Sequence, residues 1–554
     1  MNNPKNILIK YNSSIKKALM KLEATSEKLL ICISGNGSYV GVITDGDIRR
    51  AILSKANIDQ SIEKYINRSS VFIKKAEDFE TALNKINQKI QVVPVIGSKK
   101  EVIGYYSLRD RYSKDQIKNN NIIVIGLGYV GLTLAMTLAE AKFKVFGYDN
   151  NKELVNKLKK GIPSFYEKGL QKYIDSHLNK NFSLLKKIKK DTGSVFILAV
   201  GTPINKNNFP NLNNMQVATK LVGKNLKKGD IVILRSTIPI GTTREKIIPI
   251  LQKESKLLAG RDFYISVSPE RTAEGVAMKE LKINPQIVGS IDELSRQKTT
   301  NLFNTFTHSI VNVGSLEAAE FAKLMDNAYR DHRFAFINQM IALSEKIGID
   351  LTKLVYAVNH GYNRNDIPIP SPGVGGPCLS KDPHILASTF KKLKLNPELI
   401  IKSREVNEKQ IDFLINKLSK LLKKIGKNIN SSKIFLIGLA FKGEPETNDT
   451  RKSTSLLFLK KLKNKNNIFA YDYEIDPKII KIKLKIKPIS ISSGFKKADA
   501  VIFLNNHKSY QNLNLSKLLS GLNKPMVLID TWHNFDPSEV RKYKKVIYGG
   551  LGVG

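Results

Sequence analysis

The stretch GVGGPCLSKD contains Cys378, one of only two cysteines in the 554-residue chain. A cysteine acts as a nucleophile when a nearby cation or a helix N-terminus lowers its pKa. Lys381 and Asp382 follow within four positions, and Asp382 also fits the N-cap of a helix that has Pro383 at its first position. Taken alone, a buried structural thiol is the simpler interpretation of Cys378. The loop therefore predicts either a buried thiol or a nucleophile.

A second motif predicts a dinucleotide site. The stretch IIVIGLGYVGLTLAMTLA places Gly126, Gly128 and Gly131 in the pattern Gly-x-Gly-x-x-Gly, after a strand-like run and at the start of a helical one. Asp149 ends the next strand-like run, KVFGYD, where a carboxylate binds a ribose 2′-hydroxyl. The glycines let a pyrophosphate approach the helix N-terminus, and an acid at Asp149 repels a 2′-phosphate. The motif therefore predicts NAD rather than NADP.

A dehydrogenase gains from a thiol when an aldehyde has to be oxidised further. The thiol adds to the aldehyde, a second hydride leaves, and water cleaves the resulting thioester. This chemistry also needs a donor for the oxyanion and a carboxylate that manages water. Lys323 and Asn327 share one face of a helical run, and Glu270 and Glu274 follow the strand-like run FYISVS. Taken alone, Lys323 is more typical of a solvated surface and Glu274 could be an ordinary exposed acid, so the prediction rests on the set.

These residues are spaced along an alternating pattern of strands and helices. The runs IIVIGL, KVFGYD, SVFILAV, DIVILRS and FYISVS alternate with helical segments, which predicts a parallel sheet. A long helix is predicted between an N-cap at Ser315 and a stop at Gly348, and a second strand–helix set follows it. We therefore predict an α/β fold with two Rossmann-like doubly wound domains joined by a long central helix. The predicted domains are an N-terminal α+β pair at 1–115, an NAD-binding domain at 120–310, a central helical domain at 311–425 and a C-terminal domain at 426–554.

The N-terminal segment contains an internal repeat. GVITDGD and GYYSLRD share the form Gly-x-x-(Ser/Thr)-x-x-Asp, and each follows a β-rich apolar run. The hydroxyls and carboxylates of Thr44, Asp47, Ser107 and Asp110 could bind ribose and phosphate, or the aspartates could only cap the following helices. The segment resembles a tandem cystathionine-β-synthase-type (CBS) domain pair. That resemblance implies binding of an adenine nucleotide, AMP or ATP, at these four residues.

Composition narrows the classes of function. The net charge of +41 suggests nucleic-acid binding, but the lysines are scattered and form no dense basic tail. We therefore expect no nucleic-acid partner, and a general attraction for anionic ligands. The two cysteines lie too far apart in sequence for metal-ligand spacing, so we expect no metal and a reducing, cytoplasmic setting. No signal peptide or membrane span is expected.

The ordered motifs together resemble the UDP-glucose/GDP-mannose dehydrogenase family over roughly residues 120–550. They are GLGYVG, GYD, FYEKGL, AVGTP, STIPIGTT, SPERTAEG, EFAKLMDNAYR, GVGGPCLSKD and GLAFKGEPETNDTRKS. The resemblance implies oxidation of C6 of a nucleotide sugar to a carboxylate with two NAD in succession. It also implies a homodimer, or a higher homo-oligomer, formed at the central helix.

The resemblance also implies a role for each matching residue. Cys378 would be the nucleophile, Lys323 the amine that stabilises the oxyanion, and Glu270 the carboxylate that promotes thioester hydrolysis. Asn327 and Asp382 would hold water and substrate, and Thr202 would line the cofactor and water site. The implied NAD-binding residues are Gly126, Gly128, Tyr129, Val130, Gly131, Asp149, Thr202, Ser236 and Thr237. The implied sugar-nucleotide contacts are Arg271, Glu274, Lys323, Asn327, Arg364, Gly375, Lys442 and Arg451, with Arg364 reaching across a subunit boundary.

Two features bear on the choice of sugar. Arg271 follows Ser-Pro-Glu as in the branch that acts on UDP-N-acetylhexosamines, whereas Lys381-Asp382 is closer to the UDP-glucose enzymes. We predict a UDP-N-acetylhexosamine ahead of UDP-glucose, with GDP-mannose third, and a uronic acid product that serves surface polysaccharide. The alternative from another class is a catalytically inactive CBS protein that senses adenylates.

Overall fold

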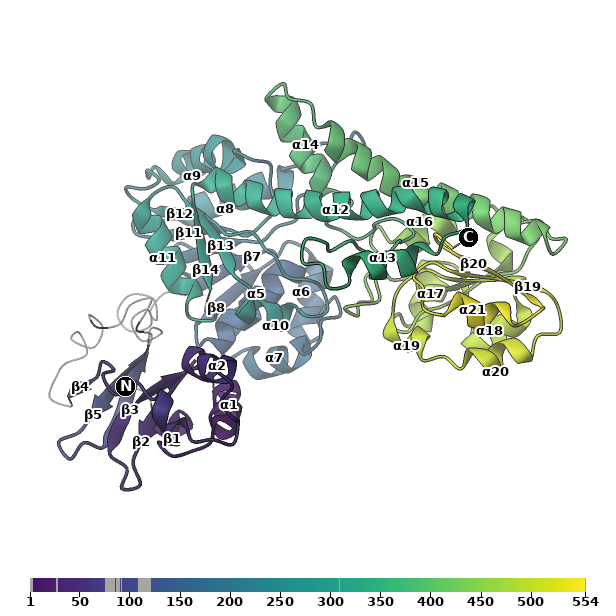
Figure 1. The fold of residues 1–554 in the computed structure, drawn as a ribbon. Coiled ribbons are helices and arrows are strands. Elements are labelled where there is room, and N and C mark those ends of the chain that lie inside the picture. The colour runs from purple at the N-terminus through teal and green to yellow at the C-terminus, as the bar shows by residue number, and fades with distance from the viewer. Residues whose placement is uncertain are drawn as a thin grey trace. The chain divides into compact units, whose positions relative to one another are not determined.

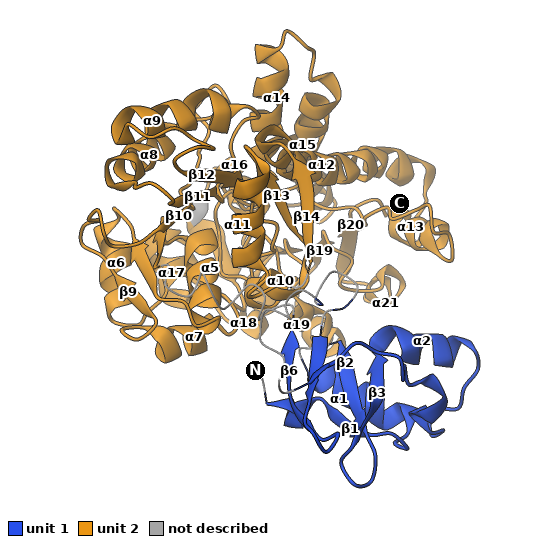
Figure 2. Cartoon of the chain, turned by 90° about the vertical axis from the view of Figure 1, so that its left-hand side faces the viewer, with its two compact units in different colours: residues 1–119 blue, residues 120–554 orange. Residues whose placement is uncertain are grey.

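The computed structural model describes residues 3–25, 28–74, 85, 90, 92–107, 121–307 and 309–553. The chain divides into two compact units, residues 1–119 and 120–554 (Figure 2). Asp110 lies outside the described residues, and so does the predicted boundary between residues 115 and 120.

The first unit repeats one strand arrangement. In each copy a first strand pairs in parallel with a second, which pairs antiparallel with a third. The two hairpins match in register, since Leu29 faces Thr44 and Val92 faces Ser107. Each also shifts register just before the end of its middle strand. The elements are β1 (Leu8–Lys10), α1 (Ile15–Ala24), β2 (Leu29–Ile33), β3 (Tyr39–Thr44), α2 (Asp45–Leu53), β4 (Ile73–Lys74), β5 (Val92–Ile96) and β6 (Val102–Ser107), with 3-10 turns at Pro4–Asn6 and Ile62–Tyr65.

The second unit begins with an eight-stranded sheet in the order β14-β13-β12-β11-β10-β7-β8-β9 (Figure 1). Its neighbouring strands are parallel except for the pair β12 and β13. The central strands are buried on both faces, as their continuous apolar runs require. The strands are β7 (Ile122–Ile125), β8 (Val145–Tyr148), β9 (Phe182–Leu184), β10 (Val195–Leu198), β11 (Ile231–Leu234), β12 (Tyr264–Val267), β13 (Gln286–Ser290) and β14 (Ile310–Gly314).

Helices connect these strands, so the predicted alternation is confirmed. α5 is apolar almost all round and buried. The helices are α5 (Tyr129–Glu140), α6 (Lys152–Lys159), α7 (Leu170–His177), α8 (Asn213–Asn225), α9 (Ile248–Ser255), α10 (Ala277–Ile283) and α11 (Glu293–Phe303), with a π turn at Thr243–Ile247.

A 32-residue helix, α12 (Leu316–Ile347), connects the two sheets of this unit. The predicted caps are confirmed: the Ser315 side chain accepts a hydrogen bond from the Ala318 N–H, and Gly348 ends the helix in the left-handed conformation. α14 and α15 pack against α12 (Figure 1). The further helices here are α13 (Leu351–Asn359), α14 (Asp382–Lys392) and α15 (Glu398–Lys423).

The C-terminal part is a second parallel sheet, in the order β17-β16-β15-β18-β19-β20. The predicted fold class is thereby confirmed. Its strands are β15 (Ile434–Ile437), β16 (Ile468–Tyr471), β17 (Lys487–Pro488), β18 (Ala500–Phe503), β19 (Met526–Asp530) and β20 (Val546–Gly550). Its helices are α16 (Thr454–Lys461), α17 (Pro477–Lys483), α18 (Ile491–Lys497), α19 (Lys508–Gln511), α20 (Leu515–Ser520) and α21 (Pro537–Arg541), with a 3-10 turn at Lys465–Asn467.

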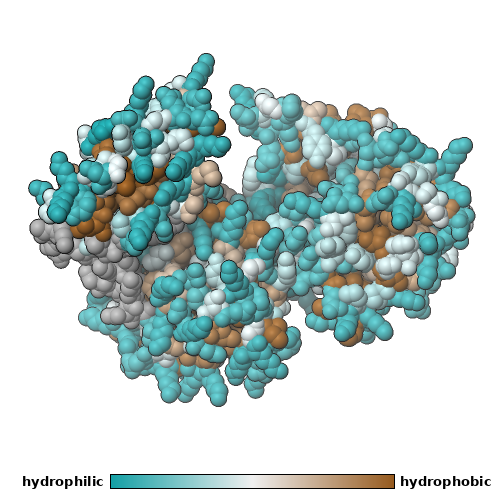
Figure 3. All heavy atoms as spheres, turned by 90° about the horizontal axis from the view of Figure 1, so that it is seen from below, coloured by the Kyte–Doolittle hydropathy of each residue, from teal (hydrophilic) through white to brown (hydrophobic). Residues whose placement is uncertain are grey.

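The surface reflects the scattered charge of the sequence. The face in Figure 3 is mostly hydrophilic, and its hydrophobic side chains form small groups. Among the described residues, none of the helices has both the length and the apolar character that a bilayer crossing needs.

Candidate active site

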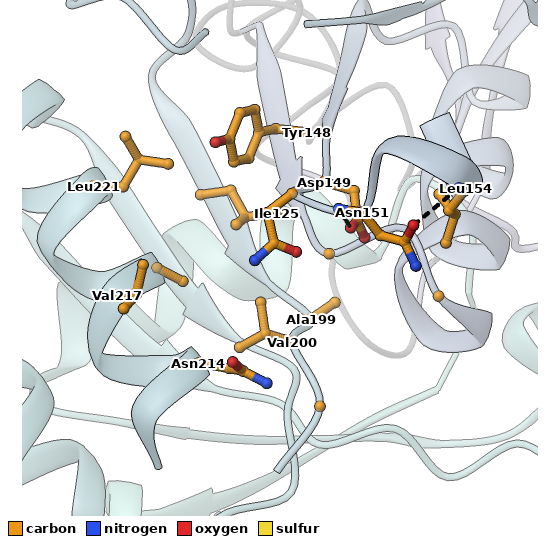
Figure 4. A pocket seen from close by; sticks show the side chains of 15 residues that line it. Ile125, Tyr148, Asp149, Asn151, Leu154, Ala199, Val200, Asn214, Val217 and Leu221 are labelled. Carbon is orange, nitrogen blue, oxygen red and sulfur yellow. Dashed lines mark hydrogen bonds between the residues drawn. The ribbon is translucent and has the colours of Figure 1, made fainter. Parts of the chain in front are cut away.

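A cavity of about 380 Å³ opens at the carboxyl ends of β7, β8 and β10 (Figure 4). Asp149 borders it directly after β8, and Val200 borders it after β10. Val217 and Leu221 of α8 form an apolar wall. A crevice at this edge of a parallel sheet is where α/β folds bind nucleotides.

The three glycines of the dinucleotide motif have different structural tasks. A Cβ on Gly126 would come within 2.7 Å of the Ala199 carbonyl oxygen, and its φ of 93° is one that side chains disfavour. A Cβ on Gly131 would lie 1.8 Å from the Gly126 carbonyl oxygen. Gly128 has no atom within 4 Å of its Cβ position and borders the cavity. Gly126 and Gly131 therefore shape the loop, and Gly128 leaves room beside the helix N-terminus.

The Asp149 carboxylate is fixed at the mouth of this cavity. Its Oδ2 accepts the Leu127 N–H at 2.7 Å and its Oδ1 accepts the Asn151 N–H at 2.8 Å. A carboxylate oxygen can accept a second hydrogen bond, so acceptor capacity for ribose hydroxyls remains. These residues therefore fit the ribose of NAD.

The other predicted cofactor residues lie outside the lining of this cavity. The Tyr129 hydroxyl lies 2.9 Å from both Glu167 Oε2 and the Ala273 carbonyl oxygen. Thr202 Oγ1 donates to the Thr237 carbonyl oxygen, and Ser236 Oγ donates to a carbonyl in the loop after β10. Val130 is half-buried in the first turn of α5. These side chains mainly connect the loops that surround the cavity.

The thiol loop ends at the start of α14. The Cys378 carbonyl oxygen accepts the backbone N–H of Asp382 at 2.9 Å. The prediction that Asp382 caps α14 is wrong: Lys381 is the N-cap residue, and Asp382 occupies the first turn. The Asp382 side chain instead points inward and is fully buried. It accepts hydrogen bonds from Asn327 Nδ2 at 2.5 Å and from Lys381 Nζ at 2.5 Å.

One face of α12 lies beside this loop. Lys323 is 8% exposed and Asn327 is 1% exposed, so the solvated alternative for Lys323 does not hold. Cys378 itself reaches solvent. The protein atoms around its sulfur and the charge of Asp382 raise the pKa of the Cys378 thiol, while Lys323 and Lys381 act in the opposite direction. The thiol, the amine and the carboxylate are therefore close enough to influence one another.

Glu270 lies in a buried ion pair. Arg235 Nη2 donates to Glu270 Oε2 at 2.8 Å, and the backbone N–H groups of Arg271 and Thr272 donate to Oε1. Burial alone would raise the pKa of Glu270, but Arg235, the Thr272 N–H and Lys323 outweigh it and hold the pKa below its ordinary range. Glu270 is therefore an ionised carboxylate at neutral pH.

Glu274 connects the two sheets of the second unit. Lys442 Nζ donates to the Glu274 carbonyl oxygen at 2.6 Å, and Arg451 Nη2 lies 3.2 Å from Glu274 Oε1. Arg451 also pairs with Asp449 at 2.5 Å. Burial and the charge of Asp449 raise the pKa of Glu274 to about 7, against the opposing effect of Arg451 and Lys442. The two predicted phosphate-binding cations therefore lie beside the Glu274 loop.

Comparison with known proteins places these features in a family. The UDP-glucose/GDP-mannose dehydrogenase models match three parts of the chain: the NAD binding domain at residues 120–307, the central domain at 317–409 and the UDP binding domain at 435–537. The chain belongs to the UDP-glucose/GDP-mannose dehydrogenase family. It is an NAD-dependent oxidoreductase of the nucleotide-sugar dehydrogenase type. A CBS domain model matches residues 2–54.

Named relatives are similar over nearly their whole length. The UDP-N-acetyl-D-mannosamine dehydrogenase of Campylobacter jejuni is 32% identical over 72% of this chain and 98% of its own. The UDP-N-acetyl-D-glucosamine 6-dehydrogenase of Salmonella typhi is 30% identical over 72% of this chain and 92% of its own. A solved UDP-D-ManNAc dehydrogenase from Pyrococcus horikoshii has a TM-score of 0.70 at 28% identity, covering 78% of this chain and 99% of its own.

Three predicted substrate residues of this dehydrogenase contact other parts of the protein. Arg271 Nε is 3.6 Å from Asp326 on α12. Arg364 is exposed and lies over the Tyr362 ring. A Cβ on Gly375 would lie 2.6 Å from the Lys452 carbonyl oxygen, so protein atoms occupy the space where a side chain would be. A contact of Gly375 with substrate would have to use its backbone.

In the N-terminal unit, Thr44 and Asp47 form a capping box at the start of α2. Asp47 Oδ2 accepts from the Thr44 N–H at 2.9 Å, and its Oδ1 pairs with Arg50 at 2.5 Å. The capping alternative is thus the arrangement that the structure contains. Ser107 ends β6, the position of Thr44 in the first copy.

Three side chains of the C-terminal part have the residue types of a cation-binding site. Among the described residues, ligand atoms of Glu446, Glu474 and His507 lie within 4.8 Å of one another. However, His507 Nδ1 accepts the Ser509 N–H at 3.1 Å. In a neutral ring the proton then lies on Nε2, which faces Glu474 Oε1 at 3.4 Å and has no lone pair for a metal.

Sequence reasoning missed several buried polar residues of the site. Arg235 and Arg404 are fully buried arginines that form ion pairs with Glu270 and Asp331. Glu320 of α12 accepts three hydrogen bonds from Gly241 and Thr243 in the STIPIGTT loop. A charged residue at the end of the apolar run DIVILR was the available signal for Arg235.

Proposed function

We propose that this dehydrogenase oxidises C6 of a UDP-N-acetylhexosamine to the uronic acid in two steps, using two NAD. The observation that supports it most is the grouping of Lys323, Asn327 and Asp382 beside Cys378, with an ionised Glu270 near Lys323. NAD supplies the hydride acceptor for both oxidations. The residues in this group match the needs of thioester chemistry: a nucleophile, an oxyanion donor and a carboxylate.

In the first oxidation the C6 alcohol loses a proton and a hydride and becomes an aldehyde. The Cys378 thiol then adds to the aldehyde carbon, and the proton on sulfur passes to the new hydroxyl. Loss of the second hydride together with the hydroxyl proton leaves a thioester, which water cleaves to the carboxylate, a proton and the free thiol. The buried ammonium of Lys323 would stabilise the oxyanion, and Glu270 would orient the water. Asn327 and Asp382 would hold both substrate and water.

The proposed sugar is chosen from the names of the relatives and from Arg271. The relatives named above act, by their names, on UDP-N-acetyl-D-mannosamine or UDP-N-acetyl-D-glucosamine. Arg271 is consistent with that branch. Lys381 donates to Asp382, so the Lys-Asp pair that resembles the UDP-glucose enzymes has a structural task here. UDP-glucose remains the alternative substrate.

Further parts of the proposal concern assembly and organisation. Exposed apolar side chains follow one face of α12, which supports a homodimer at this helix; they are Phe321, Met325, Tyr329, Phe336, Leu343 and Ile347. Light scattering on Phe336→Asp tests the dimer, which should dissociate. We also propose four domains, at residues 1–115, 120–310, 311–425 and 426–554. The remaining proposals are adenine-nucleotide binding by the N-terminal unit, a cytoplasmic setting and a role in surface polysaccharide.

The test is a product and stoichiometry assay across UDP-N-acetylmannosamine, UDP-N-acetylglucosamine, UDP-glucose and GDP-mannose. We expect two NADH for each sugar consumed and a uronic acid as product. Cys378→Ala should lose at least roughly a hundredfold in kcat, about 3 kcal/mol. One NADH for each sugar, or a free aldehyde as the final product, would refute the proposal. No turnover of any sugar would favour the inactive sensor.

A further inference from the structure

Arg404 of α15 is a buried cation that contacts both sides of the thiol loop. Its side chain is 2% exposed, and Nη1 donates to Asp331 Oδ1 at 2.6 Å. Nη1 also donates to the Leu379 carbonyl oxygen at 3.1 Å, and Nη2 donates to the Val374 carbonyl oxygen at 3.0 Å. Cys378 lies between these two carbonyls in the chain. A planar guanidinium can hold three oxygens at once, which a single ammonium cannot do with the same geometry.

Asp331, the carboxylate that pairs with Arg404, lies on the same face of α12 as Lys323. Asp331 follows Lys323 by eight residues and Asn327 by four, so the three side chains share one face of α12. Asn407 of α15 fixes Asp331 further, because its Nδ2 donates to Asp331 Oδ1 at 2.8 Å and to its carbonyl oxygen at 2.9 Å. Asp331 is itself fully buried, so the pair has little freedom to move.

The first half of the loop is held by other contacts. The Ser371 N–H donates to Asn338 Oδ1 at 2.9 Å. A Cβ on Gly373 would lie 2.3 Å from the Asn407 carbonyl oxygen, so the loop lies directly on α15 there. Arg404 holds both ends of the segment from Val374 to Leu379, and between them the Gly376 N–H donates to the Lys452 carbonyl oxygen at 3.1 Å. Val374, Ser380 and Arg404 also line a cavity of about 570 Å³, which leaves space beside this part of the loop.

We propose that Arg404 is a positioning residue that sets the placement of Cys378 relative to Lys323 by holding Val374 and Leu379 against Asp331. The inference rests on the proposed function, in which Cys378 is the nucleophile. Removing the guanidinium fork would let the loop shift toward this cavity. The thiol would then move away from the ammonium of Lys323, whose charge favours the thiolate.

The test compares Arg404→Lys with the wild-type enzyme. Lysine keeps a positive charge against Asp331 and so avoids a buried unpaired carboxylate, but it cannot hold both loop carbonyls. We expect kcat to fall by roughly tenfold or more while the KM for NAD stays within about twofold. The midpoint of the pH profile for alkylation of Cys378 by iodoacetamide should move away from its wild-type value, because burial, Asp382 and Lys323 all act on this thiol. Cys32 does not interfere, because burial raises the pKa of its thiol to about 12.

Lys417→Met is the matched control. Lys417 also lies on α15, is mostly buried and bridges to α12 through Glu345 and to a backbone carbonyl, at Gly550, away from the thiol loop. It should lower the melting temperature without moving kcat beyond about twofold or the alkylation midpoint. The proposal is overturned if Arg404→Lys keeps both the wild-type kcat and the wild-type midpoint, or if Lys417→Met reproduces its effects.

The alkylation assay is run without sugar or NAD, so it does not depend on the reaction. If Cys378→Ala still produced two NADH for each sugar, the proposed function would fail, while a shifted midpoint in Arg404→Lys would still support the positioning role. If the stoichiometry assay behaves as expected and the midpoint does not move, only the positioning role fails.

Discussion

At the scale of single residues, the protonation of Cys378 decides how it can react. Its pKa is raised by its surroundings and by Asp382, so the free enzyme holds a thiol rather than a thiolate at neutral pH. The thiolate is the form that attacks an aldehyde, so the sulfur must lose its proton as it adds, and that proton ends on the new oxygen. Lys323 is placed to favour charge on the new oxygen.

Glu274 should make substrate binding depend on pH. Its pKa of about 7 means that it loses its proton between about pH 6 and pH 8. The new negative charge lies beside Arg451 and near Lys442, and it competes with an anionic diphosphate for both cations. We therefore expect the KM for the UDP-sugar to rise with pH across this range in the wild-type enzyme. Initial-rate measurements at several pH values check this.

In Glu274→Gln the rise of KM with pH should flatten. Glu317→Gln is the control, because Arg244 holds the pKa of Glu317 below its ordinary range, so that this residue stays ionised across the same window. A slope that survives in Glu274→Gln, or one that disappears in Glu317→Gln, would assign the titration to another group.

At the scale of elements, local patterns predicted much of the fold. Alternating apolar runs and the caps at Ser315 and Gly348 depend on neighbouring residues, and the structure confirms them. Asp382 was predicted as a cap from the same kind of local signal, but a partner on α12, Asn327, draws its carboxylate inward. Arg404 could not be predicted because its partners come from α12 and from the thiol loop, which only the tertiary fold brings together.

The two glycines of the dinucleotide loop should respond differently to alanine. Gly131→Ala would place a Cβ 1.8 Å from the Gly126 carbonyl oxygen, so the turn between β7 and α5 must shift. We expect a lower melting temperature and weaker NAD binding. Gly128→Ala meets no protein atom within 4 Å, so the melting temperature should stay within a few degrees while the KM for NAD rises. Equal melting temperatures for both variants would contradict this division of tasks.

At the scale of the whole molecule, the N-terminal unit is a repeat joined to a dehydrogenase. The sequence motif predicted the repeat, and the matching hairpin registers support it. Its function could not be predicted in the same way, because the residues of the motif at Thr44 and Asp47 satisfy one another as a helix cap. Thr44 and Asp47 can bind a nucleotide only through hydrogen bonds that they make in addition to those of the capping box.

Calorimetric titration of AMP and ATP into the full chain tests the proposed nucleotide site. NADH is kept at saturation so that the dinucleotide cavity is occupied. We expect heat of binding that is lost in Asp47→Ala and kept in Asp45→Ala, a matched change in the same turn that removes only the surface pair with Arg49. Absence of heat in the wild-type chain would leave the unit without the proposed ligand.

The account as a whole depends on a covalent intermediate at Cys378. The most direct measurement is intact-protein mass spectrometry of acid-quenched turnover, on the wild-type enzyme and on Glu270→Gln, in which hydrolysis should be slow. We predict an acyl adduct with the mass of the oxidised UDP-sugar, located on Cys378 by peptide mapping and released by hydroxylamine. Formation of two NADH for each sugar without any adduct on Cys378 in either protein would contradict the account.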